Sequence, residues 1–227
     1  MTSFEAPVVA VDGPNAAGKG TLCQLLAGHF GFHLLDSGAL YRLVALAASQ
    51  AGASFEDIEE LVGHARDLAV SFSVQPGGVK VLLDGADVTQ RIRTETVGNL
   101  ASKVAALDPV RSALLDRQRA FRQPPGLVAD GRDMGTVVFP DATVKIFLTA
   151  SAEVRARRRH NQLRDQGIDV NLATLSAEIE ERDRRDRERA VAPLRPADDA
   201  ITVDSSHVSI EAVFAQVRET VRKRMSP

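Results

Sequence analysis

The chain has 227 residues, 44% hydrophobic and 26% charged, a composition typical of a folded, soluble protein with one or two domains. Its formal net charge of −2 excludes a protein that binds nucleic acid through a strong overall positive charge. No apolar run approaches the roughly 20 residues of a membrane span. Residues 1–7 carry no basic side chain and the chain has a single cysteine, so we expect a cytoplasmic protein without a membrane partner.

Short apolar runs alternate with helical patterns along most of the chain. The expected strands are 7–11, 32–35, 127–129, 143–148 and 200–203, and the expected helices are 19–30, 39–51, 151–166, 172–189 and 209–224. This alternation predicts an α/β fold in which a five-stranded parallel sheet is flanked by helices.

The stretch from about residue 55 to residue 125 interrupts the alternation. Segments 56–68 and 110–121 have helical patterns, and 71–74 and 79–83 flank a Gln-Pro-Gly-Gly sequence, which predicts a β-hairpin. Antiparallel strands with their own helices indicate an inserted α+β subdomain at about 55–125. The core would then comprise 1–54, 126–150 and 190–227.

A glycine-rich loop follows the first strand and precedes the first helix, with the spacing Gly, four residues, Gly, Lys. Glycines let successive backbone N–H groups point at one anion, and the helix N-terminus adds free donors. The expected ATP-binding residues are therefore Gly13, Pro14, Asn15, Ala16, Ala17, Gly18, Lys19, Gly20 and Thr21. The alternative is an ordinary glycine-rich turn between a strand and a helix.

One position departs from the usual phosphate-binding loop. Gly20 stands after Lys19, where most such loops carry the Ser or Thr that holds Mg²⁺, and the hydroxyl comes one residue later at Thr21. Asp130 ends an apolar run and would lie at the carboxyl edge of the sheet, where ligands bind. We therefore expect Thr21 and Asp130 to hold Mg²⁺, in part through water; a capping role is the alternative for Asp130.

Arginine is concentrated between residues 155 and 189, which contain ten of them, interspersed with acidic residues. Alternating charge on two solvated helices would explain this pattern, but Arg also binds phosphate in a bidentate manner. Two other predicted strand ends carry an Arg beside a short polar residue, Ser37 with Arg42 and Arg132 with Asp133. A second, smaller phosphorylated substrate would need such groups, although each pair alone could be a plain ion pair or cap.

Together these motifs resemble bacterial cytidylate kinases, through residues 13–21, 35–42, 130–136, 138–141 and 181–194. The resemblance implies a P-loop kinase core, a monophosphate-binding insertion and a short Arg-rich helical lid at about 151–189. It implies that ATP and Mg²⁺ are used and that CMP or dCMP accepts the phosphoryl group. It also implies cytosine contacts from Ser37, Asp133, Arg111 and Arg189, acceptor-phosphate contacts from Arg42 and Arg132, and pentose contacts from Ser102, Arg182 and Asp186.

The same resemblance places the lid arginines at Arg155, Arg157, Arg158 and Arg159. Of these, Arg157 is expected to bind ATP, and the other three are expected to be catalytic together with Lys19, Arg42 and Arg132. A monophosphate oxygen is already ionised near pH 7, so the expected mechanism needs positioning and charge neutralisation rather than a general base. The spacing of Arg182, Asp186 and Arg189 would place all three on one face of a helix. Nothing demands more than a monomer, and we expect no nucleic-acid partner.

Three alternatives remain open from the sequence. Another P-loop kinase acting on UMP, AMP or shikimate would share the loop. A nucleotide-dependent switch of the GTPase kind would need Asn-Lys-x-Asp and Asp-x-x-Gly motifs, and neither occurs. A nucleic-acid-binding ATPase would use the Arg clusters on backbone phosphates, but one Tyr and no Trp leave little for base stacking.

Overall fold

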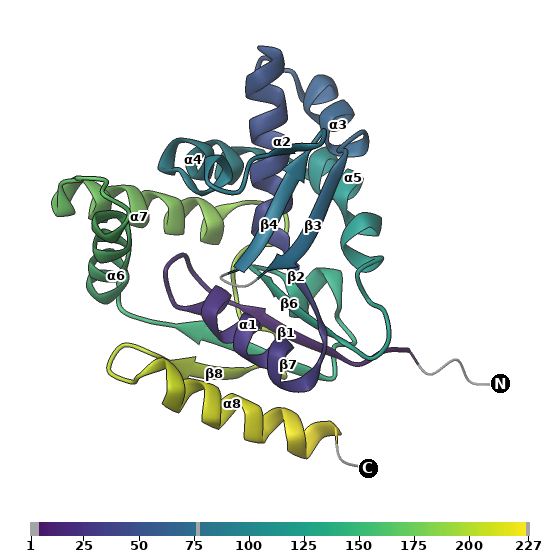
Figure 1. Ribbon diagram of the computed structural model, residues 1–227, viewed down its shortest axis with the longest axis vertical. Helices are drawn as coiled ribbons and strands as arrows, with labels where there is room; N and C mark the ends of the chain where they lie inside the picture. The colour runs from purple at the N-terminus through teal and green to yellow at the C-terminus, as the bar shows by residue number, and fades with distance from the viewer. Residues whose placement is uncertain (1–4, 76–77, 226–227) are drawn as a thin grey trace. The chain divides into compact units, whose positions relative to one another are not determined.

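The computed structural model describes residues 5–75 and 78–225, with side chains described outside 72–79 (Figure 1). The backbone divides into two compact units. The first comprises the residues up to Asp36 together with those from Gln118 onward, and the second comprises Ser37–Arg117.

A five-stranded sheet forms the centre of the first unit, in the order β2-β6-β1-β7-β8, and every pair of neighbours is parallel. The strands are β1 (Val8–Asp12), β2 (His33–Asp36), β6 (Leu127–Gly131), β7 (Val144–Thr149) and β8 (Ile201–Asp204). All five residues of β1 are buried, because this strand lies in the middle of the sheet. The predicted α/β fold with a five-stranded parallel sheet is confirmed.

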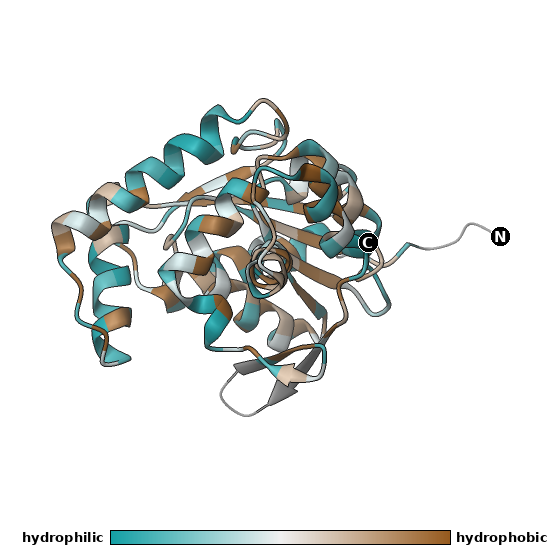
Figure 2. Ribbon diagram, turned by 90° about the horizontal axis from the view of Figure 1, so that it is seen from above, coloured by the Kyte–Doolittle hydropathy of each residue, from teal (hydrophilic) through white to brown (hydrophobic). Residues whose placement is uncertain are grey.

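Helices α1 (Lys19–Phe30) and α8 (Ile210–Met225) contact each other and the sheet. Leu22 and Leu26 of α1 form one apolar core with Val213 and Val217 of α8 and with strand residues such as Val11. The strands are largely brown in Figure 2, whereas the helices carry teal stretches, as expected of a sheet buried beneath amphipathic helices.

Helices α6 (Ala152–Asp165) and α7 (Leu172–Glu188) form a helical pair with a small core of its own. That core consists of Ala156 and Leu163 from α6 and Leu175 and Ile179 from α7. Side-chain caps start both helices, since Ser151 accepts from Val154 N–H and Asn171 accepts from two N–H groups. The pair lies within the segment for which an Arg-rich lid is expected.

The second unit combines helices with a small antiparallel sheet, β3-β4-β5. Its elements are α2 (Ser37–Ala51), α3 (Ile58–Arg66), β3 (Val70–Gln75), β4 (Gly78–Leu83), β5 (Ala86–Asp87), a 3₁₀ turn (Arg91–Arg93), α4 (Glu95–Val104) and α5 (Asp108–Arg119), whose last two residues belong to the first unit. The predicted hairpin is confirmed as β3 and β4, while Pro76 and Gly77 of its turn lie outside the described residues.

Several local features were not predicted. Helix α4 has no predicted counterpart; its first turn is capped by Thr94, whose hydroxyl accepts from Val97 N–H. A single π-helical turn, Met134–Val138, follows β6. Helix α2 begins at Ser37, because the chain turns directly from β2 into the helix. The functional division into core, insertion and lid stays a prediction, and the described part of the chain contains no helix long and apolar enough to cross a membrane.

Candidate active site

The glycine-rich loop links β1 to α1 and contains three residues with positive φ. These are Gly13 at 151°, Ala16 at 59° and Gly18 at 98°. A Cβ atom on Gly13 would lie 1.9 Å from the carbonyl oxygen of Leu148, so no side chain fits there. Left-handed residues among right-handed ones turn successive N–H groups toward one point, which makes the loop suitable for an anion.

Lys19 is the first residue of α1, and its side chain folds back over the loop. Its ammonium donates to the carbonyl of Pro14 at 2.9 Å and lies 3.9 Å from Asp130 Oδ1. Burial lowers the pKa of Lys19 below its usual value and raises that of Asp130, because both groups have lost water. Nearby Arg132 lowers the Lys19 pKa further, while the attraction between Lys19 and Asp130 opposes both shifts.

The described residues contain no cluster of three or more His, Cys, Asp or Glu side chains that could hold a metal ion. Mg²⁺ bound with a nucleotide commonly uses one or two carboxylates, phosphate oxygens and water. Asp130 fits that pattern: it lies beside Lys19 and near Gly20, where a Cβ atom would be 3.7 Å from Asp130 Oδ2. Thr21 lies on the exposed side of the first turn of α1, so its hydroxyl is open to such a group.

Arg132 and Asp186 form an ion pair, with Nε 2.9 Å from Oδ2. Burial alone would raise the pKa of Asp186, but the charges of Arg132, Arg182 and Arg189 and the hydrogen bond from Arg132 lower it overall. One carboxylate therefore lies in the field of three guanidinium groups. Guanidinium groups held in place by a carboxylate suit a ligand with a phosphate group.

Asp133 and Arg189 are also brought together, with Oδ1 3.8 Å from a guanidinium nitrogen, and both side chains are buried. The expectation that α7 includes Arg189 was wrong, because the helix ends at Glu188 and Arg189 has extended dihedral angles of −59° and 138°. Arg182, Asp186 and Arg189 therefore do not lie along one helical face. Instead, Arg189 Nε donates to the carbonyl of Ala192 at 2.6 Å, which holds the turn after the helix.

The arginines of α6 differ in their surroundings. Arg155 is buried and donates to the carbonyls of Asn15 and Ala150 and to the carboxylate of Asp183. Arg158 donates to the carbonyl of Ala17, at 3.4 Å. Two of the expected lid arginines thus contact the phosphate loop through its carbonyl oxygens.

The other two expected lid arginines make contacts within α6. Arg157 is two-thirds exposed and pairs with Glu153 at 2.7 Å. Arg159 donates to Gln162 at 2.8 Å.

Four further predicted site residues belong to the second unit: Ser37, Arg42, Ser102 and Arg111. Ser37 starts α2 and is buried, and Arg42, one turn later, donates to the carbonyl of Ile92 at 2.6 Å. Arg111 donates to the carbonyl of Ala105 and lies over the ring of Tyr41, 5.6 Å from its centroid. Ser102 is buried on α4, and its hydroxyl has no hydrogen-bond partner among the described residues.

Three buried residues were missed from the sequence: Asp12, Asp183 and Ser205. Asp12 accepts from Met134 N–H and Gly135 N–H at 2.8 Å each. Asp183 pairs with Arg155 at 2.5 Å. The hydroxyl of Ser205 lies 3.0 Å from the Ala17 carbonyl and 3.0 Å from Arg158. Only Asp12 had a sequence signal, since it ends the first strand immediately before the loop.

Comparison with known proteins identifies the family. The family model for cytidylate kinase matches residues 9–223, almost the whole chain. The chain belongs to the cytidylate kinase family. The cytidylate kinase of Aeromonas salmonicida is 62% identical over 212 residues, covering 93% of this chain and 92% of the relative. That of Shewanella frigidimarina is 58% identical and covers 99% of both chains.

A solved structure supports the fold of this cytidylate kinase family member. A protein from Eubacterium ventriosum superposes with a TM-score of 0.50 at 10% identity, covering 96% of this chain and 99% of that chain. Identity this low supports the α/β architecture alone.

Proposed function

We propose that this protein transfers the γ-phosphoryl group of ATP to CMP or dCMP, which gives CDP or dCDP and ADP. An oxygen of the acceptor phosphate attacks the γ-phosphorus, and the bond from that phosphorus to the β–γ bridging oxygen breaks. The observation that carries this proposal is family membership across residues 9–223. The geometry supports it, since one unit holds both the phosphate loop with Lys19 and the cluster of Arg132 and Asp186.

The donor side of the reaction is assigned to residues 13–21. The N–H groups of the loop would bind the phosphates of ATP, and Lys19 would leave the Pro14 carbonyl to bind the outer phosphates. Mg²⁺, when bound with ATP, would neutralise charge on the β- and γ-phosphates, with Asp130 and Thr21 placed to hold it directly or through water. Arg155 and Arg158 would keep the loop carbonyls turned away from the phosphates.

The acceptor side is assigned by both chemistry and resemblance. Arg132 and Arg42 would hold the phosphate of CMP, because a planar guanidinium binds phosphate oxygens in pairs. Arg182, Asp186 and Ser102 would contact the pentose, and the unsatisfied hydroxyl of Ser102 supports this role. The cytosine ring offers an amine donor beside acceptors, which Asp133, Ser37, Arg111 and Arg189 complement.

Arg157 and Arg159 are assigned to closure over ATP. Both lie on α6 beside Arg155 and Arg158, which already contact the loop. Movement of the α6–α7 pair toward the phosphates would exclude water and add positive charge where the transferred group passes.

The test is ADP formation from ATP and Mg²⁺ with CMP, dCMP, UMP, AMP or shikimate as separate acceptors, each with a Mg²⁺-free control. We expect fast turnover with CMP and dCMP, none with AMP or shikimate, and loss of activity without Mg²⁺. Turnover with AMP or shikimate instead would overturn the assignment of the base-contacting residues. ATP hydrolysis that ignores every acceptor would overturn the kinase assignment.

A further inference from the structure

Asp12 is a buried acidic residue to which the phosphoryl transfer described above gives no role. It ends β1, directly before the phosphate loop, and its residue is 4% exposed. Lys19, the nearest cation of the loop, is hydrogen-bonded to Pro14, and its carboxylate neighbour is Asp130. The Asp12 carboxylate instead faces the segment that follows the neighbouring strand β6.

Both oxygens of Asp12 accept hydrogen bonds from that segment. Oδ1 accepts from Met134 N–H and Oδ2 from Gly135 N–H, each at 2.8 Å. The approach is close, because a Cβ atom on Gly135 would lie 3.4 Å from Oδ2 and 3.1 Å from the side chain of Lys145. These two N–H groups belong to the first residues of the π-helical turn, so the carboxylate caps its N-terminus.

The capped turn holds the two residues that precede it. The carbonyl of Asp133 accepts from Val137 N–H and Val138 N–H, at 2.9 and 3.2 Å. Arg132 and Asp133 therefore leave the end of β6 in a fixed direction, one toward Asp186 and the other toward Arg189. A displacement of the turn would move both side chains together.

The charges around Asp12 are few. Burial raises its pKa to about 7, the N–H groups of Gly135 and Met134 oppose that rise, Asp133 adds to it and Lys19 opposes it. Burying a carboxylate costs stability, but an apolar residue at this position would leave the N–H groups of Met134 and Gly135 without an acceptor. What the carboxylate contributes is therefore the pair of hydrogen bonds that fix the turn.

We propose that Asp12 is a positioning residue for the acceptor nucleotide: its carboxylate fixes the turn from which Arg132 and Asp133 reach CMP. It touches neither nucleotide itself. This inference rests on the proposed function, because Arg132 and Asp133 matter here as contacts to CMP. Strand β1, which leads into the donor-binding loop, would then also support the residues that bind the acceptor.

The test compares steady-state kinetics of the wild-type protein with Asp12→Asn, in which one oxygen acceptor is replaced by an amide that cannot accept from an N–H. We expect the KM for CMP to rise roughly tenfold or more, with the KM for ATP changed less than about twofold. Asp141→Asn is the matched control, since it removes a half-exposed carboxylate paired with Arg122, and we expect both KM values to be unchanged.

A second variant and a measurement on the wild type guard against a folding defect. Asp12→Ser keeps one small acceptor, and we expect the same selective rise in the KM for CMP. Hydrogen exchange of the wild-type chain should find the Met134 and Gly135 amides strongly protected, because both donate to a buried carboxylate.

The outcomes separate the two proposals. Equal rises in both KM values, an unchanged KM for CMP, or exchange of those two amides at the rate of a free peptide would overturn the role of Asp12. A wild-type protein that turns over neither CMP nor dCMP would overturn the proposed function itself.

Discussion

At the scale of single residues, Lys19 is the clearest assignment. Its ammonium is buried, bound to the Pro14 carbonyl, and able to move to a phosphate because the side chain is long and flexible. We predict that Lys19→Met folds but loses turnover by orders of magnitude, roughly 10²-fold or more. The reason is that the variant has no ammonium group to neutralise the negative charge on the transferred phosphoryl group. Initial rates at saturating ATP and CMP, with circular dichroism to verify folding, check this; a variant with wild-type turnover would refute the role.

Asp12 gives a prediction of pH dependence for stability. Its pKa is raised to about 7 in the folded chain, whereas an unfolded Asp titrates near its ordinary value of 3.8. Between these two values the folded state binds the proton more tightly, so the contribution of Asp12 to the free energy of unfolding falls as pH rises from about 4 to 7.

The variant Asp12→Asn removes this titration. We predict that the free energy of unfolding of the wild type, relative to that of Asp12→Asn, decreases by up to about 1.4 kcal/mol per pH unit across that range. Urea unfolding of both chains at pH 5, 6, 7 and 8 measures the difference. A difference that stays constant or grows with pH would contradict the raised pKa.

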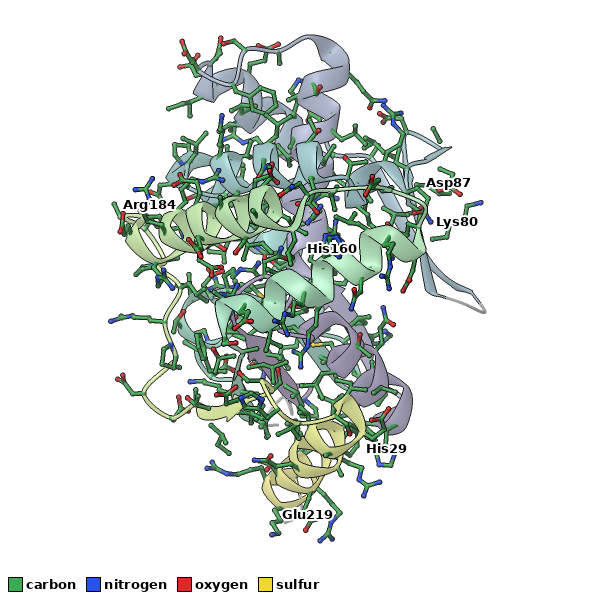
Figure 3. All side chains as sticks on the ribbon, turned by 90° about the vertical axis from the view of Figure 1, so that its left-hand side faces the viewer. His29, Lys80, Asp87, His160, Arg184 and Glu219 are labelled. Atoms are coloured by element: carbon green, nitrogen blue, oxygen red, sulfur yellow. The ribbon has the colours of Figure 1, made fainter. Side chains whose placement is uncertain are left out.

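At the scale of elements, the junction between α6 and α7 combines a small apolar core with one buried ion pair. Arg155 Nη2 lies 2.5 Å from Asp183 Oδ2, and the two side chains are 5% and 3% exposed. Arg184, the next residue on α7, pairs with Glu181 and Glu188 at the surface instead (Figure 3). Adjacent positions on one helix therefore provide a buried and an exposed ion pair for comparison.

We predict that Asp183→Ala lowers the free energy of unfolding by roughly 3–5 kcal/mol, because it leaves the buried guanidinium of Arg155 without its carboxylate. Arg184→Ala should change it far less, because water screens an exposed pair. Denaturant unfolding measures both, and equal effects of the two variants would show that the buried pair does not stabilise the helical pair.

The loop between β8 and α8 supports the phosphate loop through Ser205. Its hydroxyl lies within 3.1 Å of the Ala17 carbonyl, the Thr149 carbonyl and Arg158, and its carbonyl accepts from Arg158 at 2.6 Å. Ser206, the next residue, bonds to Asp204 and to Ser151 N–H instead.

We predict that Ser205→Ala raises the KM for ATP about fivefold, the equivalent of one lost hydrogen bond, because the loop loses one of its supports. Ser206→Ala makes the same chemical change at a residue whose hydroxyl bonds to Asp204 and to Ser151 N–H, and it should leave the KM for ATP unchanged. The KM for ATP at saturating CMP is the measurement. Equal values for the two variants would mean that Ser205 does not position the loop.

At the scale of the whole molecule, the net charge is −2, and arginine is concentrated in one segment of the chain, residues 155–189. This charge distribution favours small anionic ligands over nucleic acid. We predict a monomer in solution, with a mass of 24.4 kDa by sedimentation at all protein concentrations tested. The reason is that the described residues expose large hydrophobic side chains at only a few positions, which are Leu25, Ile58, Val137, Ile168, Leu172 and Val208. A mass near twice that value would contradict this prediction.

The sequence predicted the parallel sheet, because buried parallel strands are continuous apolar runs such as residues 8–11. It predicted the phosphate loop, because the spacing of glycine and lysine marks it. It predicted helix α1 to the residue, because Leu22, Leu25, Leu26 and Phe30 recur at helical spacing. The structure places left-handed glycines, Gly18 and Gly31, at its two ends. Helix α4 was missed, although Val97, Leu100, Ala101 and Val104 recur at helical spacing and Thr94 caps its start.

The sequence by itself determined the fold class, the phosphate loop and, through its motifs, the family, because each depends on local patterns of a few adjacent residues. Only the tertiary structure decided how the buried charges pair. Asp12 accepts a hydrogen bond from Met134, which lies 122 positions further along the chain. Ser205 bonds to Ala17, from which it is separated by 188 positions. Such contacts leave no period or spacing in the chain, since they arise where parallel strands bring their carboxyl ends to one edge of the sheet.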